Sequence, residues 1–241
     1  MATQGPARSG PLARYPALVD GVYDQLVEML MDQRLAPGSP IRTEAIARQL
    51  GVSATPVREA LARIEPSGLV ARSARRGWTA AASLTRAELV QVIDLRVLLE
   101  PEIARLACAR ADDKLRGVLA RAVRRQAVAK TGPDYANYKE FLEADWDFHR
   151  LLASNSGNPY LERTFTATSF YMQRYLLFDQ RVVTDATEST AEHEAIHLAF
   201  ERQSPDMAAA AMRDHLQRLR RRVDPRPADS ADQSVAGRDR A

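Results

Sequence analysis

The stretch from Gly51 to Val70 reads Gly-Val-Ser-Ala-Thr-Pro-Val-Arg-Glu-Ala-Leu-Ala-Arg-Ile-Glu-Pro-Ser-Gly-Leu-Val, and it predicts a turn, a helix, a stop and the start of a strand. Gly51 can adopt the left-handed conformation that ends a preceding helix. The predicted helix has an apolar face of Val57, Leu61 and Ile64, and a polar face of Thr55, Arg58, Glu59 and Ala62. A short helix of this kind is typical of DNA recognition, although an ordinary amphipathic surface helix shows the same pattern.

The neighbouring segments favour DNA recognition. The further predicted elements are a helix from Leu18 to Leu35, a turn at 37–40, a helix over 44–50 capped by Thr43, and two strands over 69–72 and 78–81 joined by 73–77. This order of helix, helix, turn, helix and hairpin predicts a winged helix-turn-helix. The hairpin is the wing, and Arg75, Arg76 and Gly77 form its tip.

The charges of this region agree with a nucleic-acid partner. Between Ser53 and Thr79 the basic residues are Arg58, Arg63, Arg72, Arg75 and Arg76, and the acidic ones are Glu59 and Glu65. An excess of arginine on one helix and on a hairpin tip suits a phosphate backbone. The whole chain of 241 residues has a formal net charge of +3 and a pI near 9.2, which permits such a partner without requiring one.

The run from Thr43 to Val70 resembles the DNA-binding domain of GntR-family transcription regulators, most specifically in Gly-Val-Ser-x-Thr-Pro-Val-Arg-Glu-Ala-Leu followed by Gly-Leu-Val. The resemblance implies that Ser53 and Thr55 contact phosphates, whereas Arg58 reads a guanine edge. The partner would be a double-stranded operator.

Two residues depart from this family pattern. Ala54 and Glu44 stand where many members carry an arginine. We therefore expect Arg58 and the arginines of the wing to carry more of the recognition in this chain.

After Thr85 the sequence pattern changes to long amphipathic helices. We predict helices over 85–110, 112–129, 134–153, 159–180, 185–202 and 205–223. The fold class is therefore mostly α, with an N-terminal winged helix-turn-helix over 15–83 and an antiparallel all-α bundle of six to seven helices over 84–223. Residues 1–14 and 224–241 are rich in Pro, Gly, Ser, Asp and Arg, and we expect them to be disordered.

Ionisable residues lie in the middle of apolar helix faces in the bundle. Asp145 and His149 share one face at a spacing of four, and His193 and His215 follow on later helices. One carboxylate and three imidazoles suit a divalent transition metal. A buried hydrogen-bonded network, in which Asp145 orients His149, is the alternative.

The second half of the chain resembles the FCD effector domain of the FadR-type branch of GntR regulators. The resemblance rests on Leu-Arg-Val-Leu-Leu-Glu at 95–100, Asp-Trp-Asp-Phe-His-Arg-Leu-Leu at 145–152, Glu-His-Glu-Ala-Ile at 192–196, and His215-Leu216. It implies that Asp145, His149, His193 and His215 bind a metal such as Zn, Ni or Mn.

The same resemblance implies a small organic acid as effector. Arg96 suits a carboxylate because its guanidinium is planar, although a structural pair with Glu100 is a competing role. Tyr171 and Arg174 are further candidates for the effector pocket.

His-Glu-Ala-Ile-His at 193–197 also matches the zinc-protease signature. A metal-dependent hydrolase, with the winged domain as a targeting module, is therefore the alternative function, and proteolysis that depends on metal and on Glu194 would indicate it. We consider the chain a regulator rather than an enzyme, because a DNA-binding half has no place in a protease.

The composition excludes other classes. The single cysteine, Cys108, rules out an intrachain disulfide and suits a buried small side chain. Neither a signal peptide nor a membrane span is recognisable, which predicts a cytoplasmic protein. We expect a homodimeric repressor that reads an inverted repeat and responds to its ligand.

Overall fold

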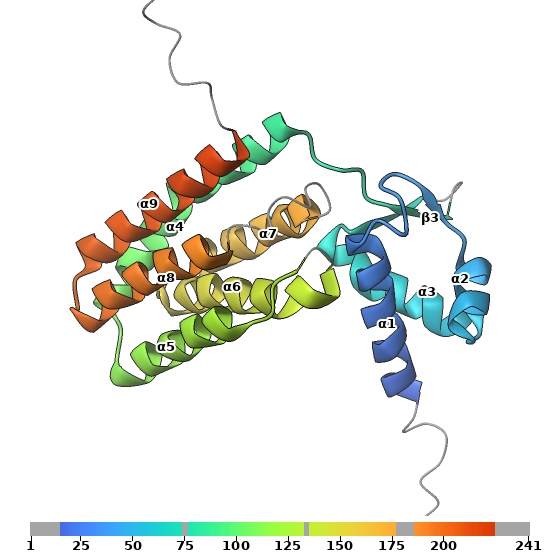
Figure 1. Ribbon diagram of the computed structural model, residues 1–241, viewed down its shortest axis with the longest axis horizontal. Helices are drawn as coiled ribbons and strands as arrows, with labels where there is room; N and C mark the ends of the chain where they lie inside the picture. The colour runs from blue at the N-terminus through green and yellow to red at the C-terminus, as the bar shows by residue number, and fades with distance from the viewer. Residues whose placement is uncertain (1–14, 74–76, 133–134, 177–185, 225–241) are drawn as a thin grey trace, which may run out of the picture. The chain divides into compact units, whose positions relative to one another are not determined.

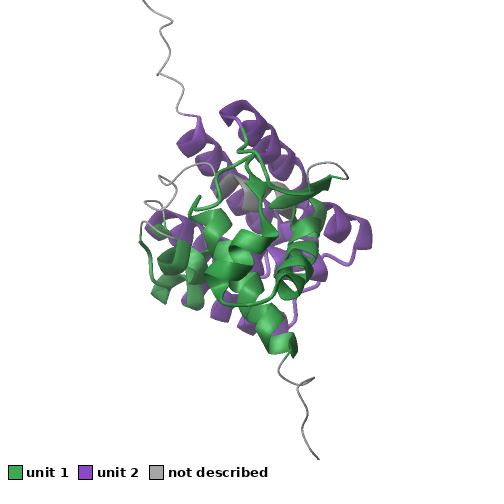
Figure 2. Cartoon of the chain, turned by 90° about the vertical axis from the view of Figure 1, so that its right-hand side faces the viewer, with its two compact units in different colours: residues 1–84, 125–144, 166–186 green, residues 85–124, 145–165, 187–241 purple. Residues whose placement is uncertain are grey.

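The computed structural model describes residues 15–73, 77–132, 135–176 and 186–224, with the side chains of 169–176 excepted. Of the ends predicted to be disordered, 1–14 and 224–241, all residues except Asp224 lie outside the described ones. The chain divides into two compact units, shown in Figure 2. Unit 1 comprises residues 1–84, 125–144 and 166–186, and unit 2 comprises 85–124, 145–165 and 187–241.

The N-terminal part of unit 1 has the predicted order of helix, helix, helix and hairpin. Its elements are α1 (Tyr15–Met31), β1 (Pro40–Ile41), α2 (Thr43–Leu50), α3 (Ala54–Ile64), the short 3-10 helix η2 (Glu65–Ser67), β2 (Val70–Ser73) and β3 (Gly77–Ala80). The strands form an antiparallel sheet in the order β1-β3-β2. Helix α3 therefore lies between the turn at Gly51 and the wing, as a recognition helix does.

Helix α3 is held by its apolar face. Val57, Leu61 and Ile64 are fully buried, and they pack in one core with residues of α1 such as Leu26. Gly51 ends α2 in the predicted left-handed conformation, with φ 67°. Truncating one of these core side chains to alanine would cost about 2–5 kcal/mol, so the core fixes which face of α3 meets solvent.

Three local expectations were wrong. Helix α1 ends at Met31 rather than Leu35, because Gln33 adopts φ 58°, which no helix continues. Pro40, which was predicted to lie in a turn, forms an edge strand with Ile41 that pairs with β3. Proline is tolerated there because an edge strand leaves one side unpaired. Helix α2 begins at Thr43 with Arg42 at its N-cap, and the Thr43 hydroxyl bonds to Glu44 instead of capping.

The remaining helices lie close to their predicted bounds, and the predicted helical residues 177–180 lie outside the described ones. They are α4 (Arg86–Ala109), α5 (Asp113–Val128), α6 (Tyr135–Asn155), α7 (Pro159–Leu176), α8 (Ala186–Glu201) and α9 (Pro205–Val223). Thr85 and Glu88 form a capping box that fixes the start of α4. Helices α4 and α9 run side by side in unit 2 (Figure 1).

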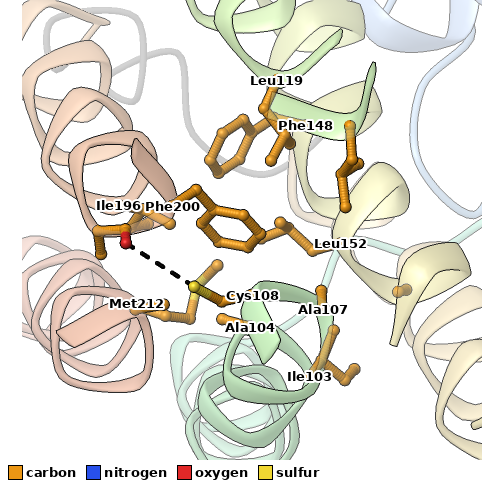
Figure 3. Close-up of a cluster of buried hydrophobic side chains, with 14 of the residues drawn as sticks. Ile103, Ala104, Ala107, Cys108, Leu119, Phe148, Leu152, Ile196, Phe200 and Met212 are labelled. Atoms are coloured by element: carbon orange, nitrogen blue, oxygen red, sulfur yellow. Dashed lines mark hydrogen bonds between the residues drawn. The ribbon is translucent and has the colours of Figure 1, made fainter. Parts of the chain in front are cut away.

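Unit 2 has its own apolar core, which Figure 3 shows. Phe148 and Phe200 are fully buried there, and Cys108 packs among them with its Sγ 3.8 Å from the Ala199 carbonyl oxygen. Burial raises the pKa of the Cys108 thiol, so the side chain acts as a small apolar group. Within the described ranges no helix combines the length and the apolar character needed to cross a bilayer.

The end of α6 that belongs to unit 1 contacts α1. The backbone N–H of Tyr135 donates to Asp32 Oδ1 at 2.8 Å, and the Lys139 ammonium lies 3.7 Å from Asp24 Oδ1.

Candidate functional site

The solvent face of α3 carries the residues predicted to meet DNA. Ser53, Thr55 and Arg58 are all exposed. Ser53 occupies the N-cap of α3, as expected, but its hydroxyl makes no capping hydrogen bond. Exposed hydroxyls at a helix N-terminus, where backbone N–H groups point outward, suit a phosphate.

Arg58 is paired with a residue of α2. Its Nη2 donates to Glu44 Oε1 at 2.9 Å, and both side chains are exposed, at 56% and 68%. The pair thus joins the first turn of α2 to the middle of α3 on the face that carries Ser53 and Thr55. The sequence showed Glu44 as a departure from a pattern, but it did not show this contact.

The other arginines of this region have different surroundings. Arg63 pairs with Asp20 at 2.6 Å and lies over the Tyr23 ring, so it fastens α3 to α1. Arg72 lies over the ring of Trp78 on the neighbouring strand. Gly77 begins β3 with φ 69°, a conformation that favours glycine. Arg75 and Arg76 lie outside the described residues.

Three histidines converge in the interior of unit 2. His149 of α6, His193 of α8 and His215 of α9 are 2%, 0% and 3% exposed. One ligand nitrogen of each lies within 4.8 Å of the others, and the ring centroids are 4.7–5.3 Å apart. The sequence placed these residues on three helices, and the fold brings their rings together.

The spacing of the nitrogens fits a bound metal ion. His149 Nε2 and His193 Nε2 are 3.2 Å apart. Two imidazole nitrogens at about 2.0–2.1 Å from one ion lie about 3.3 Å apart in a tetrahedral complex and about 2.9 Å apart in an octahedral one. The observed separation of this pair falls between these values, so His149 and His193 stand at the distance of two ligands of one ion.

Two buried carboxylates face the far sides of the imidazoles. Glu100 Oε2 lies 2.6 Å from His149 Nδ1, at ion-pair distance although not in line for a hydrogen bond. Glu192 Oε2 lies 2.7 Å from His215 Nδ1. A carboxylate hydrogen-bonded to Nδ1, as Glu192 is to His215, fixes the ring and is the usual support of metal-binding histidines.

The electrostatics favour the neutral form of His193 and His215 and the ionised form of the two carboxylates. Burial lowers the pKa of His193 well below its usual value, and it lowers that of His215 as well. Burial alone would raise the pKa of Glu192, but hydrogen bonds from His215 and Arg222 outweigh it and bring the pKa to about 2. Neutral imidazole is the form that binds a metal.

Asp145 lies at the edge of this cluster. Its Oδ1 is 3.7 Å from His193 Nε2 and 3.4 Å from Ser189 Oγ, and the side chain is 30% exposed. Among the described residues, the group whose ligand atoms all lie within 4.8 Å contains the three histidines without Asp145. Asp145 is therefore a partly buried neighbour of the cluster, and its carboxylate lies close to His193 and acts on the charge of His215.

Arg96 is buried beside the cluster and pairs with Glu100. Its Nε donates to Glu100 Oε1 and its Nη2 to Glu100 Oε2 at 3.3 Å, while Nη2 also lies 3.5 Å from His149 Nε2. The structural pair that the sequence left open is thus formed, and it leaves the guanidinium next to a histidine nitrogen. Arg96 and His149 hold Glu100 ionised against the effect of burial, with its pKa well below the usual range.

Comparison with known proteins gives these sites a context. The family model for the FCD domain matches residues 91–218, and the model for bacterial regulatory proteins of the gntR family matches 18–79. The chain belongs to the GntR family. Its N-terminal domain is the family's DNA-binding module and its C-terminal domain is an FCD domain, as the sequence resemblance implied.

Individual relatives of this GntR protein agree with the assignment. A probable D-xylose utilization operon transcriptional repressor of Paenarthrobacter nicotinovorans is 30% identical over 81% of this chain and 84% of its own length. The Nta operon transcriptional regulator of Aminobacter aminovorans is 35% identical over 58% of this chain and 65% of its own length. Among solved structures, E. coli McbR/YncC has a TM-score of 0.64 at 19% identity, covering 86% of this chain and 96% of that one, which shows the shared fold.

GntR proteins regulate transcription and are not enzymes, and the surroundings of the protease-like motif agree. His193 faces the cluster, whereas Glu194 is exposed. His197 Nε2 lies 3.3 Å from the Arg116 carbonyl oxygen and 3.2 Å from Glu201 Oε1. The hydrolase alternative requires both histidines of the motif to bind one ion. In the structure His193 and His197 face different groups, so the motif does not form such a site.

Two residues beside the histidine cluster were not predicted from the sequence, and the side chains of two predicted residues lie outside the described part of the chain. Glu192 was not singled out from the sequence; its position directly before His193 on a buried helix was the available signal. Arg222 forms a double contact with Glu192, at 2.9 and 3.2 Å, which extends the cluster to the end of α9. Tyr171 and Arg174 lie in α7, but their side chains are outside the described residues.

Proposed function

We propose that this GntR protein is a homodimeric repressor that binds an inverted-repeat operator and releases it when a small carboxylic acid binds in the FCD domain. The acid would bind beside a divalent transition metal (Zn, Ni or Mn). The observation that carries this proposal is the convergence of three buried imidazoles, two of them facing buried carboxylates. Such a protein would act in the cytoplasm, where its operator lies.

The DNA-binding part rests on the exposed face of α3. Arg58 would read a guanine through two parallel hydrogen bonds, worth about 1–3 kcal/mol of discrimination. Ser53 and Thr55 would contact phosphates, and Arg75, Arg76 and Gly77 of the wing would add contacts to the backbone. Two copies related by a two-fold axis would read the two halves of a palindromic site.

The metal would be held by His149, His193 and His215, with Asp145 as the fourth protein ligand. The 3.7 Å between Asp145 Oδ1 and His193 Nε2 supports this fourth position, because it places a partly buried carboxylate next to one of the three histidines. When bound, the ion supplies positions at which a carboxylate ligand can coordinate.

The effector's carboxylate would be oriented by Arg96, with Tyr171 and Arg174 as further contacts. A guanidinium has five donors, so Arg96 can retain Glu100 while it binds a second carboxylate. The effector must favour one arrangement of the protein over another, because it can shift an equilibrium only through differential affinity. The coupling is reciprocal, so operator binding would weaken effector binding by the same factor.

The test begins with the molecule and metal that co-purify with the protein, identified by mass spectrometry and elemental analysis. Operator affinity is then measured across a panel of carboxylic acids, with and without a chelator. We expect one acid to weaken operator binding only when metal is present. Metal-free protein with an unchanged response would refute the metal-assisted site, and unchanged affinity across the panel would refute the proposed effector class.

A further inference from the structure

A second residue is positioned to act in DNA readout through Arg58. Glu44 lies in the first turn of α2 and Arg58 in the middle of α3, and their side chains meet at 2.9 Å on an exposed surface. Both residues are exposed, and Arg58 lies about one turn of α3 after the exposed Thr55. Arg58 therefore approaches the operator with its Nη2 already hydrogen-bonded to a carboxylate.

The Glu44 carboxylate is itself held in place. The Thr43 hydroxyl, on a side chain that is buried, donates to Glu44 Oε2 at 3.0 Å. A hydrogen bond from its own backbone amide and the one from Thr43 lower the pKa of Glu44, and Arg58 adds to this effect. One oxygen is therefore fixed by the start of α2, and the other is presented to Arg58.

A fixed carboxylate on a DNA-facing surface is unfavourable by itself, because it repels phosphates. Its contact with Arg58 also allows the carboxylate to influence where the guanidinium points. A guanidinium has five donors and a guanine edge accepts two hydrogen bonds, so Arg58 can read guanine while one Nη2 hydrogen stays on Glu44. Without Glu44, the long arginine side chain is free to turn toward a neighbouring phosphate.

We propose that Glu44 is a positioning residue for DNA readout, which holds the guanidinium of Arg58 for one guanine and keeps it from the phosphate backbone. The inference rests on the role proposed for Arg58. Glu44 thereby improves discrimination between base pairs while it reduces affinity for DNA of any sequence.

The expected size of the effect follows from side-chain ordering. A direct contact of arginine with guanine is worth roughly 5- to 150-fold in preference over other bases. Ordering a long side chain on binding lowers the affinity by a factor of about 2–13. Glu44 would reduce this loss, because it orders Arg58 before DNA binds. Removing Glu44 should therefore reduce the guanine preference about 2- to 13-fold. Each phosphate contact that Arg58 gains should also steepen the salt dependence of non-specific binding by about 0.9 in log–log slope.

The experiment uses the full chain and a randomised duplex library, from which the wild type selects its site. Binding is then measured to that site, to its single-base variants and to an unrelated duplex at several salt concentrations. The variants are Glu44→Gln, Arg58→Ala and the double substitution. The control is Glu65→Gln, which removes one negative charge from an exposed position of the same domain without touching Arg58.

We expect Arg58→Ala to abolish a guanine preference at one position of each half-site. Glu44→Gln should weaken that same preference and tighten binding to the unrelated duplex, whereas Glu65→Gln should leave the preference unchanged. In the double variant the effect of Glu44→Gln on base preference should vanish, because the two residues act as one unit.

Two results would overturn the inference while leaving the role of Arg58 intact. One is an Arg58-dependent guanine preference that Glu44→Gln does not change. The other is a base preference, for instance for cytosine, that depends on Glu44 in the absence of Arg58, which would make Glu44 a direct reader. If Arg58→Ala changes no base preference, the proposed role of Arg58 fails, and the inference fails with it.

Discussion

The molecule contains two arginine–glutamate pairs in opposite environments. Arg96 and Glu100 are buried in α4, with side chains 7% and 3% exposed, whereas Arg58 and Glu44 on the helix-turn-helix are 56% and 68% exposed. Breaking a buried pair leaves an uncompensated charge in the interior, but an exposed pair exchanges its partner for water at little cost. The buried pair is therefore structural support for the histidine cluster, and the exposed pair is able to rearrange when DNA arrives.

The largest expected effect is that of Glu100→Ala. It leaves Arg96 buried without its carboxylate and removes the group that faces His149 Nδ1, so the free energy of unfolding should fall by about 3–5 kcal/mol. Urea unfolding followed by circular dichroism measures this change.

The matched control is Glu102→Ala on the same helix. Glu102 pairs with Arg105 through two hydrogen bonds of 2.8 and 2.7 Å, but both side chains are 40% or more exposed. We expect a loss within about 1 kcal/mol. Equal losses for the two variants would show that burial does not distinguish the pairs.

The next effect concerns the metal proposed for the cluster beside the buried pair. An ion at 100 times its dissociation constant stabilises the folded protein by about 2.7 kcal/mol. Adding a chelator should remove this increment from the wild type, and His193→Ala should show no such increment because one ligand is missing. Thermal unfolding of each protein is measured with and without chelator. The stability that His193→Ala loses through the cavity left by the imidazole is the same in both measurements, so it cancels in the difference.

His197→Ala is the control for this experiment. It lies four residues along α8, and its Nε2 faces the Arg116 carbonyl oxygen and Glu201 rather than the cluster. It should keep the metal content and the chelator-sensitive increment of the wild type. Loss of metal in this variant would instead support a site formed by His193 and His197, which the geometry disfavours.

The two pairs also differ in how far the sequence could predict them. Arg96 and Glu100 are four residues apart on one helix, so their contact follows from helical spacing. Glu44 and Arg58 are separated by a turn between two helices, and Glu192 and His215 lie 23 residues apart on different helices. Such contacts depend on how helices pack, which spacing along one helix does not determine.

The same distinction holds for the fold. The helices of the second half were predicted to within a few residues, because long amphipathic runs with clear breaks carry a strong signal. The strand at Pro40 and Ile41 was missed because two residues show no periodicity, and its pairing with β3 involves residues nearly forty positions away. For the histidines, the shared apolar environment could be predicted from the sequence, whereas their distances depend on the packing of α6, α8 and α9.

A smaller effect is expected for Arg58→Ala, and it concerns binding rather than folding. Specific operator binding should weaken by about 1–3 kcal/mol, with stability nearly unchanged, because the side chain is exposed. Arg63→Ala on the same helix should do the reverse: it loses the pair with Asp20 and the contact with Tyr23, yet retains base preference. Measuring operator affinity and unfolding on both variants tests this assignment, and a loss of base preference in Arg63→Ala would contradict it.

The smallest effect is that of Glu44→Gln on the free energy of unfolding. An exposed ion pair contributes about 0.2–1 kcal/mol, since water screens it and two long side chains must be ordered to form it. The contribution should shrink further at high salt, whereas that of the buried pair should hardly change. Urea unfolding at low and high ionic strength, on Glu44→Gln and Glu100→Ala in parallel, makes this comparison. A loss above 2 kcal/mol for Glu44→Gln would mean that the exposed pair is structural, and that Arg58 is bound too firmly to Glu44 to adjust to a base.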